Sequence, residues 1–177
     1  MLDVDCDIVA GEWDPQQDWP ALAERAVAAA LAGAGYGDVV AGKADVEVSI
    51  RLGDDEEVRR LNRDYRGMDK PTNVLAFPMH APADIPRIIR SSGLDVLIGD
   101  IALAAETVVA QAETRQVSVA DHATHLIVHG TLHLLGHDHG DDASAEEMEA
   151  LETRILASLG IADPYRADVS HAVDERQ

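Results

Sequence analysis

The chain has 177 residues, a formal net charge of −19 and an apolar content of 46%. This length favours one domain with a hydrophobic core, and the apolar content argues against extensive disorder. The acidity argues against a general nucleic-acid or DNA binder, because phosphate contacts need Lys and Arg.

The start of the chain does not resemble a targeting segment. Its first ten residues, MLDVDCDIVA, are acidic where a signal peptide needs a basic flank. No run approaches the roughly 18 to 20 apolar residues of a membrane span. Cys6 is the only cysteine, so no internal disulfide can form. We therefore predict a cytoplasmic protein that has no membrane partner.

The first half of the chain predicts two strands and two capped helices. Residues 2–9 and 46–50 show the apolar alternation that is typical of strands. Asp18 is followed two residues later by Pro20, which predicts the start of an alanine-rich helix. This helix is expected to stop at the glycines 33, 35 and 37. Asp54 caps a charged helix that is expected to end near Gly67.

The second half predicts two more strands, over residues 73–77 and 94–101. The segment 79–93 between them holds two prolines and is expected to be a loop. Three helices are expected after the last strand, over residues 102–115, 119–135 and 142–159.

These elements mix strands and helices without a regular βαβ alternation, which predicts an α+β fold. We expect a small mixed β-sheet packed with helices, in a single domain over residues 1–165. The polar stretch that begins at Tyr165 lacks helical periodicity, so we expect a frayed C-terminal tail over residues 166–177.

Six of the eight histidines lie between residues 122 and 139. Residues four apart share one face of a helix, so His129 and His133 can bind one zinc ion. Gly136 can take the left-handed conformation that ends a helix, and the chain can then double back to bring in His139. Three neutral nitrogens leave a fourth position open, as in catalytic zinc sites. We predict one zinc ion per chain on these three histidines.

The other histidines of this cluster leave alternatives open. A single buried histidine is more often a hydrogen-bonded core residue than a ligand. His125 lies one turn before His129, which makes it either a core residue or a neighbour of the ligands. His137 follows the glycine that ends the helix, and we expect it to point elsewhere.

The spacing His-x3-His-x2-Gly-x2-His is that of the metzincin proteases. Those enzymes carry a glutamate directly after the first histidine as the general base for peptide hydrolysis. Gly130 stands at this position. The absence of that base from the motif counts against a peptidase.

Three segments of the chain are distinctive: HGTLHLLGHDH (129–139), YRGMDKPTNVLAFP (65–78) and IGDI (98–101). Together they resemble the YbeY family of bacterial endoribonucleases, the ribosomal RNA maturation factors. The resemblance runs from about Asp45 to Tyr165, and the first forty residues carry little of it.

The resemblance implies a zincin-like, metal-dependent hydrolase. It implies a zinc-dependent, single-strand-specific endoribonuclease that acts in 16S ribosomal RNA 3′-end maturation and ribosome quality control. Its partners would be ribosomal RNA and the small ribosomal subunit. The family's metal ligands fall on His129, His133 and His139, and its functionally important arginine falls on Arg66. Departures from the family pattern occur at Met68, Ala76 and His137, where lysine, serine and tyrosine are usual.

In this hypothesis Arg66 pairs with an RNA phosphate, because its planar guanidinium suits bidentate contact. Residues 51–90 hold eight of the 14 basic and seven of the 33 acidic side chains. This distribution allows a local basic surface on an acidic body, but spacing alone favours an ordinary solvated helix face. Asp100 either orients a ligand or accepts a proton, or has a structural role at a strand end.

Two other functions of the chain stay open: a metal-dependent hydrolase of a non-RNA substrate, and a non-catalytic ribosome-assembly factor with structural zinc.

Overall fold

The computed structural model describes residues 1–40, 45–91, 95–137 and 140–165. Within these residues four strands form one sheet, in the order β1-β2-β4-β3. The strands are β1 (Leu2–Ile8), β2 (Val46–Gly53), β3 (Val74–Pro78) and β4 (Val96–Ala104). The first two pair in parallel, β2 pairs in parallel with β4, and β3 runs antiparallel to β4 at the edge. The sheet is therefore mixed.

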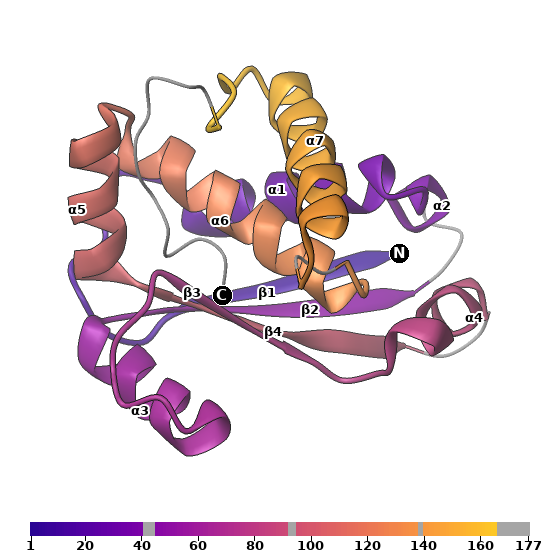
Figure 1. The fold of residues 1–177 in the computed structure, drawn as a ribbon, viewed down its shortest axis with the longest axis horizontal. Helices are drawn as coiled ribbons and strands as arrows, with labels where there is room; N and C mark the ends of the chain where they lie inside the picture. The colour runs from indigo at the N-terminus through magenta and orange to yellow at the C-terminus, as the bar shows by residue number, and fades with distance from the viewer. Residues whose placement is uncertain (41–44, 92–94, 138–139, 166–177) are drawn as a thin grey trace.

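Helices cover the two faces of this sheet unequally (Figure 1). The helices are α1 (Trp19–Gly33), α2 (Gly37–Val40), α3 (Asp55–Arg66), α4 (Ile85–Arg90), α5 (Ala105–Arg115), α6 (Val119–Leu134) and α7 (Asp142–Ser158). On one face α1 and α6 pack against the strands, and α7 packs on these two helices. On the other face lies α3. The predicted α+β fold, a small mixed sheet packed with helices, is confirmed.

Alternate residues of the central strands face two separate cores, as the period of two in a strand requires. The larger core, beneath α1 and α6, contains Ile50, Ile101 and Leu126. The smaller core, beneath α3, contains Val58 and Ala102. Two neighbouring residues of β4 therefore serve opposite faces of the sheet.

Capping residues set the helix ends that the sequence predicts. The Asp18 carboxylate accepts a hydrogen bond from the Ala21 N–H at 3.1 Å, and the Asp54 carboxylate accepts one from the Glu57 N–H at 2.8 Å. Gly67, with φ of 71°, ends α3 in the left-handed conformation. Each contact satisfies backbone groups that a helix end leaves without an intrahelical partner.

Two predictions about the second half of the chain are wrong. The expected loop 79–93 contains a short 3₁₀ helix (Pro82–Asp84) and α4, because its prolines occupy first turns, where no N–H is needed. The last strand continues to Ala104 instead of residue 101, because its pairing with β2 and β3 continues. Its predicted first residue, Leu94, lies outside the described residues, as does the predicted tail 166–177.

Within the described part of the chain, no helix combines the length and apolar character that a membrane span needs.

A buried polar network joins α6, α5 and the start of β3. His122 Nε2 lies 2.8 Å from Gln111 Oε1, and Asn73 Nδ2 donates to the same oxygen at 3.0 Å. A neutral imidazole can supply the N–H that this oxygen accepts. Burial, together with the nearby His125 and Arg115, lowers the pKa of His122 to about 3. His122 therefore stays neutral in the folded protein at pH values where an exposed histidine is charged.

Acid should destabilise the fold through His122. Its folded pKa lies below the ordinary value of 6.5, so below pH 6.5 the unfolded chain binds a proton that the folded chain excludes. Stability is therefore lost as the pH falls from 6.5 towards 3. The parent protein should therefore lose unfolding free energy between pH 6.5 and pH 4. In His122→Gln, which has no imidazole at this position, we expect this loss to be smaller by about 3 kcal/mol. Urea unfolding of metal-free protein measures this, and equal losses in parent and variant would contradict it.

Candidate metal centre

The candidate site lies along α6, between the sheet and α7. Gly130 faces the sheet, where an added Cβ would lie 3.1 Å from side-chain atoms of Ile101. This glycine lets α6 approach β4 closely. His129 and His133 share a different face of the helix, and His129 contacts α7 through Glu152.

His129 and His133 bring their Nε2 atoms to within 3.2 Å of each other. Two nitrogens held at 2.0–2.1 Å from one tetrahedral ion are about 3.3–3.4 Å apart. The spacing in the structure therefore fits a shared zinc ion. The expected convergence of the two imidazoles on one helix face is present, and metal binding itself stays a prediction.

Helix α6 ends at Leu134, and Gly136 follows its C-cap in the left-handed conformation that the sequence indicates. Gly136 has φ of 96°, and an added Cβ would lie 2.8 Å from Pro82 Cβ. His139, the predicted third ligand, lies outside the described residues. Within the residues that are described, no group of three or more metal-binding side chains is present.

A buried carboxylate on α7 supports His129. Glu152 has no exposed surface; its Oε1 accepts a hydrogen bond from His129 Nδ1, and its Oε2 accepts one from the Tyr165 hydroxyl. His125 Nε2 lies 3.6 Å from the same Oε2. Burial opposes ionisation of Glu152, but the hydrogen bond from His129 and the electrostatic interactions with His129 and the nearby His125 outweigh it. Together they lower the pKa of Glu152.

The Glu152 contact selects one tautomer of His129. A neutral histidine has a single N–H, and donating it from Nδ1 leaves the Nε2 lone pair directed towards His133. This tautomer is the one that a zinc ligand binding through Nε2 requires. Zinc-binding histidines commonly donate their other N–H to a carboxylate in this way. The residues present therefore fit zinc.

The sequence interpretation missed Glu152 and misplaced Tyr165. Tyr165 was expected to begin a frayed tail, but its ring packs edge-on against His125, with 5.6 Å between centroids. Its N–H also donates to Asp163 Oδ1 at 2.8 Å. A signal for Glu152 was present, because it lies four residues after Met148 on the apolar face of α7. A carboxylate in such a position is buried only with partners.

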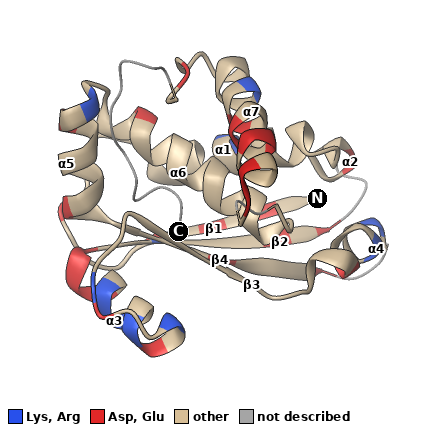
Figure 2. Ribbon diagram, in the orientation of Figure 1, with Lys and Arg blue, Asp and Glu red and all other residues tan. Residues whose placement is uncertain are grey.

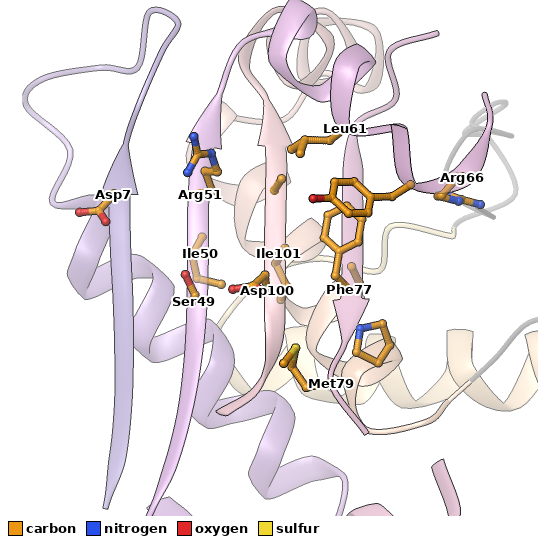
Figure 3. A pocket seen from close by; sticks show the side chains of 14 residues that line it. Asp7, Ser49, Ile50, Arg51, Leu61, Arg66, Phe77, Met79, Asp100 and Ile101 are labelled. Atoms are coloured by element: carbon orange, nitrogen blue, oxygen red, sulfur yellow. The ribbon is translucent and has the colours of Figure 1, made fainter. Parts of the chain in front are cut away.

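Arg66 lies on the other side of the sheet from the histidine pair. It is the last residue of α3 and lines a cavity of about 800 Å³ on that side (Figure 3). Asp100 lines the same cavity from the middle of β4, so the expected position at a strand end is wrong. The structure brings His129 and His133 together and does not bring Arg66 to them.

Comparison with known proteins supplies the family. The model of the family described as "Endoribonuclease YbeY" matches residues 13–160. The chain belongs to the YbeY family. Endoribonuclease YbeY of Sphingopyxis alaskensis is 53% identical over 156 residues, which cover 88% of this chain and 93% of the relative. Endoribonuclease YbeY of Rhizorhabdus wittichii is 51% identical over 154 residues, which cover 87% of this chain and 91% of the relative.

A solved structure is also similar to the chain. The solution structure of TM1509 from Thermotoga maritima is 21% identical, with a TM-score of 0.48. The match covers 94% of this chain and 99% of that chain. The family resemblance seen in the sequence is confirmed by the family model and by the close relatives.

For this member of the YbeY family, elemental analysis should find one zinc ion per chain. The zinc content should fall sharply in His129→Ala, His133→Ala and His139→Ala, because each substitution removes a predicted ligand. His171→Ala should keep its zinc. Full zinc content in His139→Ala would contradict the assignment of the third ligand.

Glu152→Gln should weaken zinc binding about ten- to 100-fold, the usual effect of losing a carboxylate behind a histidine ligand. The amide preserves the size of the side chain but removes the charge that supports His129. Competition with a chromophoric chelator measures the affinity. Glu146→Gln, an exposed position on the same helix, is the matched control and should bind zinc like the parent. Equal affinities in both variants would exclude the supporting role of Glu152.

Proposed function

We propose that the chain is a zinc-dependent, single-strand-specific endoribonuclease of the cytoplasm. Its proposed substrate is ribosomal RNA of the small subunit, in 16S 3′-end maturation and ribosome quality control. Membership of the YbeY family supports the nuclease activity, and relatives that are 51–53% identical carry the name Endoribonuclease YbeY. The metal requirement rests on one observation, the convergence of His129 Nε2 and His133 Nε2 in front of buried Glu152.

The proposal gives each residue of the metal centre a role. His129, His133 and His139 would hold the ion, and Glu152 keeps His129 in the tautomer that binds through Nε2. A zinc ion at this position supplies a Lewis acid that stabilises negative charge on a phosphate oxygen. Gly130 leaves α6 without the glutamate that peptide hydrolysis uses in metzincins, which supports a nuclease over a peptidase.

Arg66 is proposed to bind an RNA phosphate. Two other arginines of α3 already form ion pairs: Arg59 pairs with Asp69 at 2.9 Å, and Arg63 pairs with Asp64 at 3.0 Å. Figure 2 shows the acidic first turn of this helix and the mainly basic positions that follow it. Within the described residues Arg66 forms no ion pair, and its side chain is exposed beside the cavity. Its guanidinium is therefore available to a phosphate, which its planar fork can bind through two N–H groups.

Cleavage assays on ribosomal RNA test the proposed activity. Zinc-loaded protein should cut a single-stranded fragment that spans the 3′ end of precursor 16S RNA, leave the same fragment intact when it is annealed, and leave casein uncut. His133→Ala should cut nothing. Zinc-dependent cleavage of casein would point to a peptidase. A zinc-loaded protein that cuts no RNA would favour a hydrolase of another substrate or an assembly factor.

Arg66→Ala should separate phosphate binding from metal binding. We expect normal zinc content and a loss in kcat/KM for RNA cleavage of about 2–3 kcal/mol in transition-state binding, typical of a charge-assisted hydrogen bond. Arg66→Lys should recover only part of this loss, because a point charge cannot make a two-pronged contact. Arg60→Ala removes an exposed arginine of the same helix that does not line the cavity, and it should cleave like the parent. Parental cleavage by Arg66→Ala at matched zinc content would reduce Arg66 to a solvated helix end.

A further inference from the structure

The cavity on the α3 side of the sheet has no part in the metal centre. Its volume of about 800 Å³ is in the range of small-molecule sites and can hold a nucleotide. It opens between α3, β3 and the strands β4 and β2 (Figure 3). The lining side chains that bear on its chemistry are Ser49, Arg51, Tyr65, Arg66, Phe77 and Asp100.

Two aromatic rings form one wall of this cavity. Tyr65 is 73% exposed, and its ring meets Phe77 edge-on with 5.6 Å between the centroids. Figure 3 shows Phe77 between Arg66 on one side and Asp100 on the other. A large ring held by a second ring but left in water offers a flat surface to another planar group. Nucleic-acid bases stack on aromatic side chains in this manner.

The charged side chains that line the cavity favour an anion only at the end near Arg66. The Arg51 guanidinium is already paired with the Glu57 carboxylate. Asp7 and Asp100 lie towards the β1 end of the cavity and repel a phosphate there. Arg66 lies at the opposite end, beyond β3. A nucleotide bound in this cavity would therefore have its phosphate near Arg66 and its base towards Asp100.

The carboxylate of Asp100 would also favour some bases over others, because an ionised carboxylate only accepts hydrogen bonds. Guanine presents two adjacent donors, N1–H and the N2 amino group, on the edge that pairs with cytosine. One carboxylate can accept from both, as it does from the two N–H groups of an arginine. Adenine and uracil each present a single donor group on that edge, so they match Asp100 less well.

We propose that this cavity binds one unpaired nucleotide of the RNA, with a preference for guanine. The base stacks on Tyr65, its pairing edge donates to Asp100, and the phosphate contacts Arg66. The proposal rests on the function proposed above and gives single-strand specificity a physical origin. Only an unpaired base can present its face to Tyr65 and its pairing edge to Asp100 at the same time.

RNA binding measured without cleavage tests this subsite. Fluorescein-labelled eight-nucleotide oligo(U) RNAs that contain a central GG or a central AA are titrated with His133→Ala protein, and the anisotropy is recorded. We expect tighter binding of the GG strand and weaker binding of its duplex form. Tyr65→Leu should bind the GG strand about ten-fold more weakly, the effect of losing one stacked base. Tyr65→Phe keeps the ring and should bind like the parent.

Asp100→Asn should remove the preference for GG over AA, because the amide replaces one acceptor oxygen of the carboxylate with an NH2 donor that cannot accept a guanine N–H. Val109→Ala, which shortens an exposed apolar side chain on α5, is the control and should change neither affinity. Parental binding of both strands by Tyr65→Leu and Asp100→Asn would overturn the subsite, whether or not the zinc-loaded protein cleaves RNA. Binding with the expected dependences, but without cleavage by zinc-loaded protein, would support the subsite and contradict the proposed nuclease activity.

Discussion

The contact between Glu152 and His129 governs both the stability and the chemistry of the α6 side of the molecule. A carboxylate with no exposed surface stays ionised only if other groups replace its hydration. His129 and Tyr165 provide hydrogen bonds, and His125 lies close by. These partners tie α6, α7 and the chain after α7 into one unit. The same contact determines which nitrogen of His129 faces His133, so the packing of α7 and the proposed metal binding depend on one interaction.

The sheet separates two sets of side chains to which we assign proposed functions. The histidine pair lies on the face covered by α6 and α7, whereas the cavity beside Arg66 lies on the face covered by α3. On one side the sheet ends at β3, which is an edge strand in the described part of the chain, and Arg66 lies beyond it. In the proposed function, an RNA strand that reaches both sets passes around this edge. Paired RNA is too wide and too stiff to follow such a path as easily as a single strand.

Local signals in the sequence predicted most of the fold. Aspartates at helix starts and a glycine at the end of α3 act within a few residues, and the four-residue spacing of His129 and His133 follows from helix geometry. The features that were missed depend on contacts between distant segments. The last strand is longer than predicted because its neighbours in the sheet extend it. Tyr165 has a fixed position because its hydroxyl donates to Glu152 and its ring packs against His125. The cavity beside Arg66 exists only once α3 lies against β3.

The alternation along β4 restricts how its length can change. Ile101 packs under α6 next to Gly130, while the adjacent Asp100 and Ala102 face the cavity and the α3 core. Past the register shift between Leu97 and Gly99, inserting or deleting one residue within this strand would turn every later side chain to the opposite face. An isoleucine would then point into the cavity, and a carboxylate would point into the apolar core beneath the histidine helix. A point substitution in β4 changes the packing on one face of the sheet only, whereas an insertion or deletion changes the packing on both faces. We therefore infer that length variation among homologues is confined to the loops on either side of β4.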